Sequence, residues 1–321
     1  MAPPAAAPVL LGVVGDSAAG KTTITGGIAG VLGADRVTVI CSDDYHRYNR
    51  RQRAALDITA LHPDCNYVDI LEQHLRALAR GEAILKPVYN HRTGDFEPPE
   101  YVVPKHFVIV EGLLGFHTAR LRDAFQVKVF LDPPEMLRHA WKLKRDCTKR
   151  GYTEEAVRRE LERREADSAR FIRSQKRWAD LVVRFEPPAR PHDVERLDAR
   201  VTLRPTLRHP NVQRLAACCP SPELVRVSEL REGSRTAEQL HIDGRLTAAQ
   251  AALVEDALWT QRPELHNLLP EQMGQFVDGL EPRRSHPLAI TQLLIAYQLL
   301  LARLERDRVG RVPARGAALL Q

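Results

Sequence analysis

Short apolar runs alternate with amphipathic segments over the first 186 residues of this chain. The runs are rich in β-branched residues, which predicts buried β-strands. They occupy residues 9–14, 36–41, 107–114, 127–131 and 179–185. Helices are expected between them over residues 23–29, 67–78 and 134–149. Strands and helices that alternate in this way predict an α/β fold, in which helices sandwich a mostly parallel sheet.

The pattern changes after a proline-rich stretch at residues 187–191. We therefore expect a core over residues 1–188 and a C-terminal extension over residues 189–321. The extension divides into a β-rich part, 192–245, a helical part, 246–307, and a flexible tail, 308–321. Its last helix, expected over 287–304, is apolar around most of its girth and should be buried in the fold or in a subunit interface.

The first apolar run leads into the loop GDSAAGKT and then into a helix. This order matches G-x-x-x-x-G-K-[ST], in which loop amides and the helix N-terminus hold the β- and γ-phosphates of a nucleotide. Lys21 would place an ammonium beside the phosphates, and Thr22 would offer a hydroxyl to Mg²⁺. An ordinary glycine turn is the alternative. The motif predicts a P-loop NTPase fold of the nucleotide-kinase type, with these ATP-binding residues: Gly15, Asp16, Ser17, Ala18, Ala19, Gly20, Lys21, Thr22 and Thr23.

Carboxylates stand at the ends of two other expected strands. Asp43 and Asp44 follow the second strand, and Glu111 follows four apolar residues of the third. Ligands of open α/β sheets bind at the carboxyl ends of the strands, so Asp43 and Asp44 are expected to face the same crevice as the phosphate loop. A solvated acidic turn is the alternative. Glu111 holds the Walker B position, where a carboxylate orients Mg²⁺ beside Thr22.

Residues 84–94 are expected to form an irregular loop, in which Tyr89, Asn90, His91 and Arg92 follow one another. Such a loop suits a polar substrate, although a lone loop histidine is more often a plain surface residue.

Charged residues gather on the expected helix 134–149 and at its end: Lys142, Lys144, Arg145, Asp146 and Arg150. A lid that closes over phosphates is one interpretation, because cationic clamps recur in phosphoryl transfer. A solvated helix face is the other interpretation.

The charge balance narrows the possible partners. The 321 residues include 47 lysines and arginines against 41 acids, a formal charge of +6, and the basic residues are scattered. Nucleic acid is therefore not an expected partner, whereas a mildly positive surface suits phosphate substrates.

The five cysteines show no C-x-x-C pair and no disulfide-style spacing, which indicates a reducing compartment. No run of 18 apolar residues occurs, so we expect a cytoplasmic protein without a membrane partner.

Six segments occur in a characteristic order: GDSAAGKT, ICSDDYH, KPVYNHRTG, VIVEGLLGFH, KLKRDCTKRGY and SQKRWADLVV. Together they resemble the phosphoribulokinase and uridine kinase family over residues 9–186. A weaker similarity continues through HIDGRL and the last apolar helix, and it is closer to the branch found in plants and cyanobacteria.

The resemblance implies a Calvin-cycle kinase that uses Mg²⁺ and ATP to phosphorylate the 1-hydroxyl of D-ribulose 5-phosphate, in a homodimer. Asp43 would be the general base and Glu111 the Walker B acid, with Lys21, Arg145 and Asp146 as further catalytic residues. Arg150 would contact ATP. The sugar-phosphate site would be lined by Asp43, His46, Arg50, Tyr89, His91, Lys142 and Arg145.

Two other functions remain open. A sibling kinase would act on uridine or another small acceptor, and residues 61–64 also resemble a uridine kinase segment. A regulatory module that binds nucleotide without catalysis is the remote alternative.

One departure from the family concerns redox control. Redox-regulated members carry a cysteine where this chain has Ala19, although the partner position, Cys41, is retained. A single thiol cannot form that disulfide, so switching by this route is not expected.

Overall fold

The computed structural model describes residues 7–188, 196–262, 273–278 and 281–310. Its strands are β1 (Val9–Gly15), β2 (Val37–Cys41), β3 (Ile84–Asn90), β4 (Asp95–Val102), β5 (Phe107–Gly112), β6 (Val127–Leu131), β7 (Leu181–Glu186), β8 (Asp198–Leu203), β9 (Val225–Glu232), β10 (Arg235–Ile242), β11 (Gln275–Asp278) and β12 (Glu281–Arg284). Its α-helices are α1 (Lys21–Leu32), α2 (Arg50–Ala55), α3 (Val68–Ala79), α4 (Ala119–Ala124), α5 (Glu135–Arg150), α6 (Glu154–Asp167), α7 (Val212–Ala217), α8 (Ala248–Trp259) and α9 (His286–Gly310).

An eight-stranded sheet forms the centre of the molecule, in the order β2-β5-β1-β6-β7-β8-β10-β9. The first five strands of this order are parallel, and β8, β10 and β9 pair antiparallel. The predicted α/β fold with a mostly parallel sheet is therefore confirmed. Because the parallel strands end at one edge, the segments after β1, β2 and β5 come together there.

The sheet buries a separate apolar core on each face. Val9, Leu11 and Val13 of β1 pack in the core that α1 and α9 cover. Leu10 and Val14 alternate with them and pack in the core that α3 and α4 cover. This period of two is the reason that β1 is apolar at every position except its glycines.

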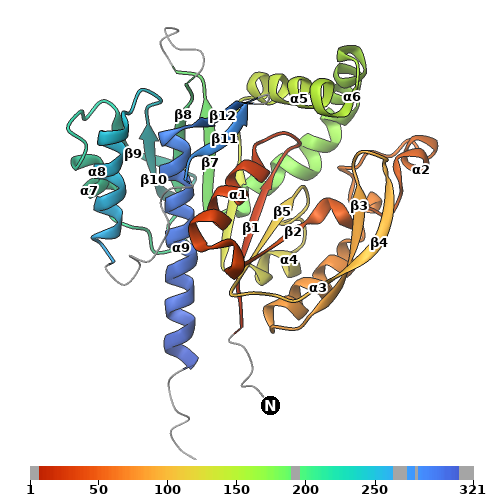
Figure 1. Ribbon diagram of the computed structural model, residues 1–321, viewed down its shortest axis with the longest axis horizontal. Helices are drawn as coiled ribbons and strands as arrows, with labels where there is room; N and C mark the ends of the chain where they lie inside the picture. The colour runs from red at the N-terminus through yellow and green to blue at the C-terminus, as the bar shows by residue number, and fades with distance from the viewer. Residues whose placement is uncertain (1–6, 189–195, 263–272, 279–280, 311–321) are drawn as a thin grey trace, which may run out of the picture.

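One sheet spans the expected boundary at residue 188. Strand β8 pairs with β7 over six residues, from Leu181 opposite Leu203 to Glu186 opposite Asp198. The helices α7 and α8 then lie beside β9 and β10, on the side of the molecule away from α2 (Figure 1). The division at 188 stays a prediction, and so does most of the tail over 308–321, since residues 311–321 lie outside the described residues.

Helix α9 is buried in the fold, which is one of the two expected positions for it. It packs against α1, β1, β8 and α8, and Figure 1 shows its upper half beside α1. By length and composition the segment His286–Arg308 would pass as a membrane span, but 78% of its most apolar window is buried inside the protein. Burial of this kind is typical of a core helix.

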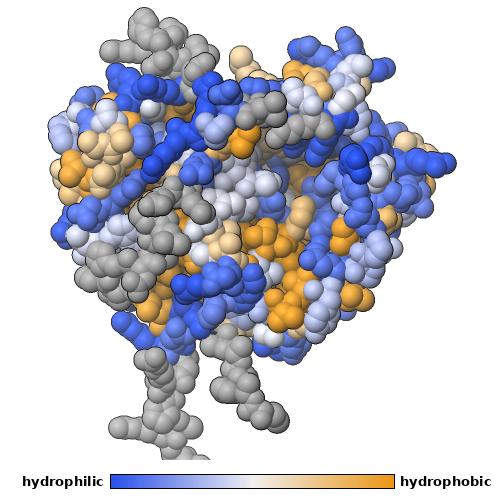
Figure 2. Space-filling view, viewed as in Figure 1, coloured by the Kyte–Doolittle hydropathy of each residue, from blue (hydrophilic) through white to orange (hydrophobic). Residues whose placement is uncertain are grey.

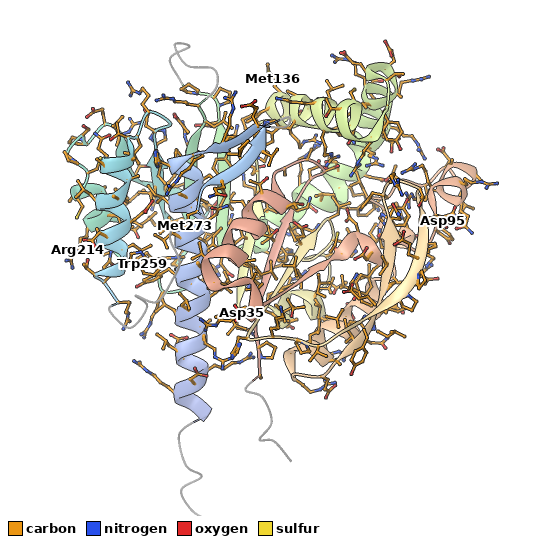
Figure 3. The ribbon with its side chains drawn as sticks, viewed as in Figure 1. Asp35, Asp95, Met136, Arg214, Trp259 and Met273 are labelled. Atoms are coloured by element: carbon orange, nitrogen blue, oxygen red, sulfur yellow. The ribbon has the colours of Figure 1, made fainter. Side chains whose placement is uncertain are left out.

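The irregular loop expected over residues 84–94 is wrong, because this segment forms a hairpin of β3 and β4. The register shifts between Lys86 and Val88, around Pro87, which donates no hydrogen bond to the ladder. The proline and the shift hide the alternating pattern in the sequence. Asp95, labelled in Figure 3, opens β4 and accepts a hydrogen bond from Asn49 before α2 (3.3 Å).

The edge strand β2 is partly open to solvent. Val39 exposes 47% of its surface, although its neighbours Thr38 and Ile40 are buried. Figure 2 shows apolar surface on the face where Figure 1 draws β2 and α1.

Two adjacent glycines of α1 give a test of the α1–α9 contact. A Cβ on Gly27 would collide with the amide of Gln292, which donates to Thr23 O (3.1 Å) and accepts from Gly274 N (2.8 Å). We expect Gly27→Ala to lower the free energy of unfolding by about 1–3 kcal/mol, because the amide must give up these bonds. Urea denaturation would measure the change.

Gly26 is the matched control, since a Cβ there meets nothing within 4 Å. Gly26→Ala should raise stability by roughly 0.5–1 kcal/mol, the ordinary gain in helix propensity. Equal effects of the two substitutions would contradict the packing described here.

Candidate active site

The phosphate loop connects β1 to α1 with the geometry that its glycines predict. Gly20 has φ +90°, a left-handed conformation, and a Cβ on Gly15 would lie 2.8 Å from the carbonyl oxygen of Leu131. Ala18 also has a positive φ, 63°, which the sequence does not reveal. The Lys21 ammonium donates to the carbonyl oxygens of Gly15 and Asp16, each at 2.9 Å. The lysine therefore lies across the loop, where phosphates would bind.

The Glu111 carboxylate lies beside the start of α1. It accepts hydrogen bonds from Thr22 Oγ1 (3.1 Å) and from Thr25 Oγ1 (3.2 Å). Burial raises the pKa of Glu111, while Lys21 and the two threonine hydroxyls oppose that rise. A hydroxyl and a carboxylate oxygen are hard donors of the kind that Mg²⁺ prefers, so Thr22 and Glu111 fit this ion. Thr25 was not predicted, although it follows Thr22 by three residues and so shares its face of the helix.

Asp43 and Asp44 have different roles. Asp44 does not face the crevice as expected, because it is buried and accepts from Lys86 Nζ (2.5 Å) and from Tyr89 N (3.0 Å). Among the described residues, the Asp43 carboxylate has no hydrogen-bond or ion-pair partner. The structure thus leaves one carboxylate available to a ligand and uses the other to attach the β3–β4 hairpin to the end of β2.

Tyr89 is the centre of an aromatic cluster on the hairpin. Its ring meets His46 and His91 edge to face, with centroids 4.9 and 5.2 Å away. Its hydroxyl accepts from Arg53 Nη2 (2.7 Å), and the Arg53 guanidinium lies over the ring. The predicted residues His46, Tyr89 and His91 therefore lie together, whereas Arg53 gave no signal in the sequence.

His46 is held in one orientation. Asn66 Nδ2 donates to the carbonyl oxygens of Ala60 and His62, so its Oδ1 is free to accept from His46 Nδ1 (2.7 Å). Burial lowers the pKa of His46 to about 4, and Arg53 contributes to this shift. The ring is therefore neutral at pH 7, with its proton on Nδ1.

Cations surround His91 at the turn of the hairpin. The Arg50 guanidinium donates to His91 O (2.5 Å) and lies near the ring of Tyr152 (5.9 Å). Burial lowers the pKa of His91, Arg150 and Arg145 act in the same direction, and Asp43 opposes them. The hairpin turn is close to Asp43, because an Asp43 carboxylate oxygen lies within 4.8 Å of a His91 ring nitrogen.

Asp146 organises the cations of α5. It accepts from Lys142 Nζ (2.7 Å) and Arg145 Nε (2.8 Å), and Arg150 Nη1 lies 3.4 Å away. Burial alone would raise the pKa of Asp146, but hydrogen bonds from Arg145 and Lys142 hold it below the usual range. Lys142 is buried in this pair, whereas the Arg145 and Arg150 side chains are about a third exposed. Arg145 and Arg150 are thus the two cations of this group that can reach a ligand.

Asp16 joins the phosphate loop to the helices above it. Its carboxylate accepts from Ser17 N (2.7 Å) and from Ser168 Oγ, and it lies 3.5 Å from Arg138 Nη1. Arg138 belongs to α5, and Ser168 follows α6. Figure 1 shows these two helices at the top of the view, and Figure 3 labels Met136 on α5. The side chain of Asp16 therefore connects the phosphate loop to α5 and to the segment after α6, while the loop backbone remains available to phosphates.

In the rest of the predicted ATP site, Ser17 is half-buried and Ala19 is buried. Thr23 is exposed on α1, and its carbonyl oxygen accepts a hydrogen bond from Gln292. All five cysteines are free, Cys41 among them.

The pKa of His46 makes stability depend on pH. An unfolded histidine titrates near 6.5, whereas His46 in the folded protein titrates near 4, so the unfolded chain binds more protons between these values. The neutral His46 therefore contributes about 3 kcal/mol to the free energy of unfolding above pH 6.5. This contribution is lost as the pH falls towards 4. Urea titrations at several pH values should show a shallower loss of stability in His46→Gln than in the wild type.

The exposed His106 supplies the control. A loss of stability that is equally steep in the wild type, His46→Gln and His106→Gln would contradict a neutral, buried His46.

Comparison with known proteins agrees with this geometry. The model of the phosphoribulokinase / uridine kinase family matches residues 10–189. A phosphoribulokinase of Synechocystis is 38% identical over 195 residues, which cover 61% of this chain and 59% of that protein. A uridine kinase of Chloroflexus aurantiacus is 34% identical over 181 residues, 54% of this chain and 86% of that protein. This chain thus spans about three fifths of the length of the cyanobacterial relative.

A solved phosphoribulokinase of Rhodobacter spheroides supports the fold. It superposes with a TM-score of 0.58 over 81% of this chain and 99% of that one, at 18% identity. The P-loop kinase fold is therefore confirmed, including a mostly parallel sheet between helices. Because the family model matches more than half of the 321 residues, the chain belongs to the phosphoribulokinase and uridine kinase family.

Proposed function

We propose that this protein transfers the γ-phosphate of ATP to the 1-hydroxyl of D-ribulose 5-phosphate, forming ribulose 1,5-bisphosphate. The observation that carries the proposal is the Asp43 carboxylate, which is unpartnered among the described residues and lies within 4.8 Å of a His91 ring nitrogen. Asp43 follows β2 at the same edge of the sheet at which the phosphate loop follows β1. The similarity to a cyanobacterial phosphoribulokinase supports the same substrate.

Asp43 would act as the general base. It is the second residue after β2, and Cys41 at the end of β2 stands opposite Glu111 in the parallel register. A carboxylate at this edge can accept the proton of a hydroxyl that is held in line with the γ-phosphate. Asp44 cannot share this role, because Lys86 and Tyr89 occupy its oxygens.

The 5-phosphate of the acceptor would bind on the side of Asp43 that faces away from ATP. Arg50, Arg145 and Arg150 bring three guanidinium groups to the neighbourhood of His91. Asp146 is shared by Arg145, Arg150 and Lys142, so positive charge remains in excess there. A sugar phosphate would neutralise this excess, whereas an acceptor without a phosphate would not. His46, Tyr89 and His91 would supply the polar and aromatic wall for the sugar.

Thr22 and Glu111 would hold Mg²⁺ beside the phosphates. The ion would neutralise charge on the transferring phosphoryl group, while Lys21 and the loop amides orient ATP. A homodimer and a cytoplasmic location complete the proposal, both resting on the resemblance to the family.

Uridine is the second candidate acceptor. The uridine kinase of Chloroflexus is matched over most of its length. The ATP-binding residues therefore do not distinguish a kinase of ribulose 5-phosphate from a kinase of uridine. The guanidinium groups around His91 favour the sugar phosphate.

A side-by-side assay separates these acceptors. Purified protein with Mg²⁺ and ATP would receive ribulose 5-phosphate, ribose 5-phosphate, uridine or buffer, and ADP release would be followed by a coupled reaction. We expect turnover with ribulose 5-phosphate alone. Turnover with uridine would assign the sibling activity, and no turnover with any acceptor would favour the non-catalytic module.

The neighbouring carboxylates provide a second test. Asp43→Asn should lower kcat by about 10²–10⁴-fold, because it removes the general base, while ATP binding and stability are kept. Asp44→Asn should instead lower the free energy of unfolding by up to about 3–5 kcal/mol, because the buried Lys86 ammonium would keep only the exposed Glu100 carboxylate, 3.6 Å away, as an ion-pair partner. Kinetics, ATP titration and urea denaturation measure the three quantities. Full turnover in Asp43→Asn would exclude Asp43 as the base.

A further inference from the structure

Three different metal-binding side chains meet beside the catalytic edge of the sheet. Cys41 ends β2, Asp43 lies in the turn that follows, and His91 lies in the turn of the β3–β4 hairpin. Their ligand atoms, the thiol Sγ, a carboxylate oxygen and a ring nitrogen, all lie within 4.8 Å of one another, and each side chain is partly exposed. In the proposed function only Asp43 and His91 have a role, and the thiol has none.

We propose that Cys41, Asp43 and His91 form a binding site for Zn²⁺, distinct in its donors from the Mg²⁺ site at Thr22 and Glu111, and that Zn²⁺ bound there inhibits the kinase.

The donor set selects a borderline-soft cation. Thiolate, imidazole and carboxylate are the three side-chain ligands of protein zinc sites, whereas Mg²⁺ takes oxygen ligands. Ligand atoms around a tetrahedral zinc ion lie about 3.3–3.8 Å apart, given Zn–S and Zn–N or Zn–O bonds of about 2.3 and 2.0 Å. The present separations, each at most 4.8 Å, therefore need to close by no more than about 1.5 Å, which side-chain rotation can supply. Three protein ligands leave a fourth position for water.

The surroundings hold two of the ligands in place. The His91 ring packs against Tyr89, and its carbonyl oxygen accepts from Arg50. The hairpin that carries it is attached to the turn of Asp43 through the Asp44–Lys86 pair, at 2.5 Å. The site therefore joins two segments whose relative position is already fixed, which lowers the entropic cost of binding an ion.

The local charge also suits a cation. Burial raises the pKa of the Cys41 thiol, and the carboxylates of Asp43, Asp44 and Glu111 raise it further. Zn²⁺ binding would release the thiol proton to solvent as the Zn–S bond forms. Arg145 and Arg150, on the His91 side, are the opposing charges.

Bound Zn²⁺ would stop phosphoryl transfer directly. A coordinated Asp43 oxygen cannot accept the proton of the acceptor hydroxyl, and a coordinated His91 cannot contact the sugar. This inhibition rests on the proposed role of Asp43, whereas the binding of the ion does not.

Metal binding by the full chain tests the site without an activity assay. Reduced protein would be titrated with Co²⁺, whose spectrum shows a sulfur-to-metal charge-transfer band when a thiolate binds, and Zn²⁺ would then displace the Co²⁺. We expect one ion per chain and a clear band. Cys41→Ser should lose the band and bind Zn²⁺ at least about 10–100-fold more weakly, since even the loss of a supporting group costs that much.

Cys147→Ser is the matched control, because Cys147 is also partly buried but lies on α5. It should keep the band and the affinity. A band that persists in Cys41→Ser, or equal Zn²⁺ affinity in the two variants, would overturn the site.

Kinase assays in a zinc buffer with excess Mg²⁺ and ATP test the inhibition. The wild type and Cys147→Ser should lose turnover as free Zn²⁺ rises, while Cys41→Ser keeps its own zinc-free rate. Zinc binding through Cys41 without loss of turnover would overturn the inhibition and the role of Asp43 together, but not the site. If the protein shows no kinase activity, the Co²⁺ and Zn²⁺ titrations alone decide whether the site exists.

Discussion

The parallel pairing of β2, β5 and β1 is the constraint on which the site depends. Cys41 and Val13 stand opposite Glu111 in the two registers, so the segments that follow these strands begin at one level of the sheet. The phosphate loop, the Asp43 turn and the Walker B acid therefore meet without any long excursion of the chain. A slip of either pair by one residue would turn Glu111 to the opposite face.

The elements with strong periodicity could be predicted from the sequence, and so could the loop that connects β1 to α1. The order of apolar runs and glycines specifies a parallel sheet and a phosphate site, because both depend on short-range patterns. The β3–β4 hairpin could not be predicted, since Pro87 and the register shift break its alternation. Arg53, Thr25 and Arg138 also escaped prediction, because each acts on a partner that is distant in sequence.

Adjacent residues with the same side chain have opposite roles in this protein. Asp44 is neutralised by Lys86 and fixes the hairpin, while Asp43 keeps its oxygens for a ligand. The sequence does not reveal which of the two aspartates binds Lys86 and which one faces a ligand, because the difference depends on where Lys86 lies in the fold. Because Asp44 binds Lys86 and Tyr89 of the hairpin, Tyr89 and His91 are held in a fixed position beside Asp43.

Helix α9, near the C-terminus, packs against α1 and β1 at the start of the chain and stabilises them. Gln292 holds the carbonyl of Thr23, one residue after the threonine that faces Glu111, and α9 covers the sheet face beneath α1. A fragment that ended at residue 188 would contain every predicted catalytic group and yet expose the apolar back of its nucleotide helix to water. The amino-terminal part, which carries the proposed kinase chemistry, is therefore stabilised by a segment that carries none of it.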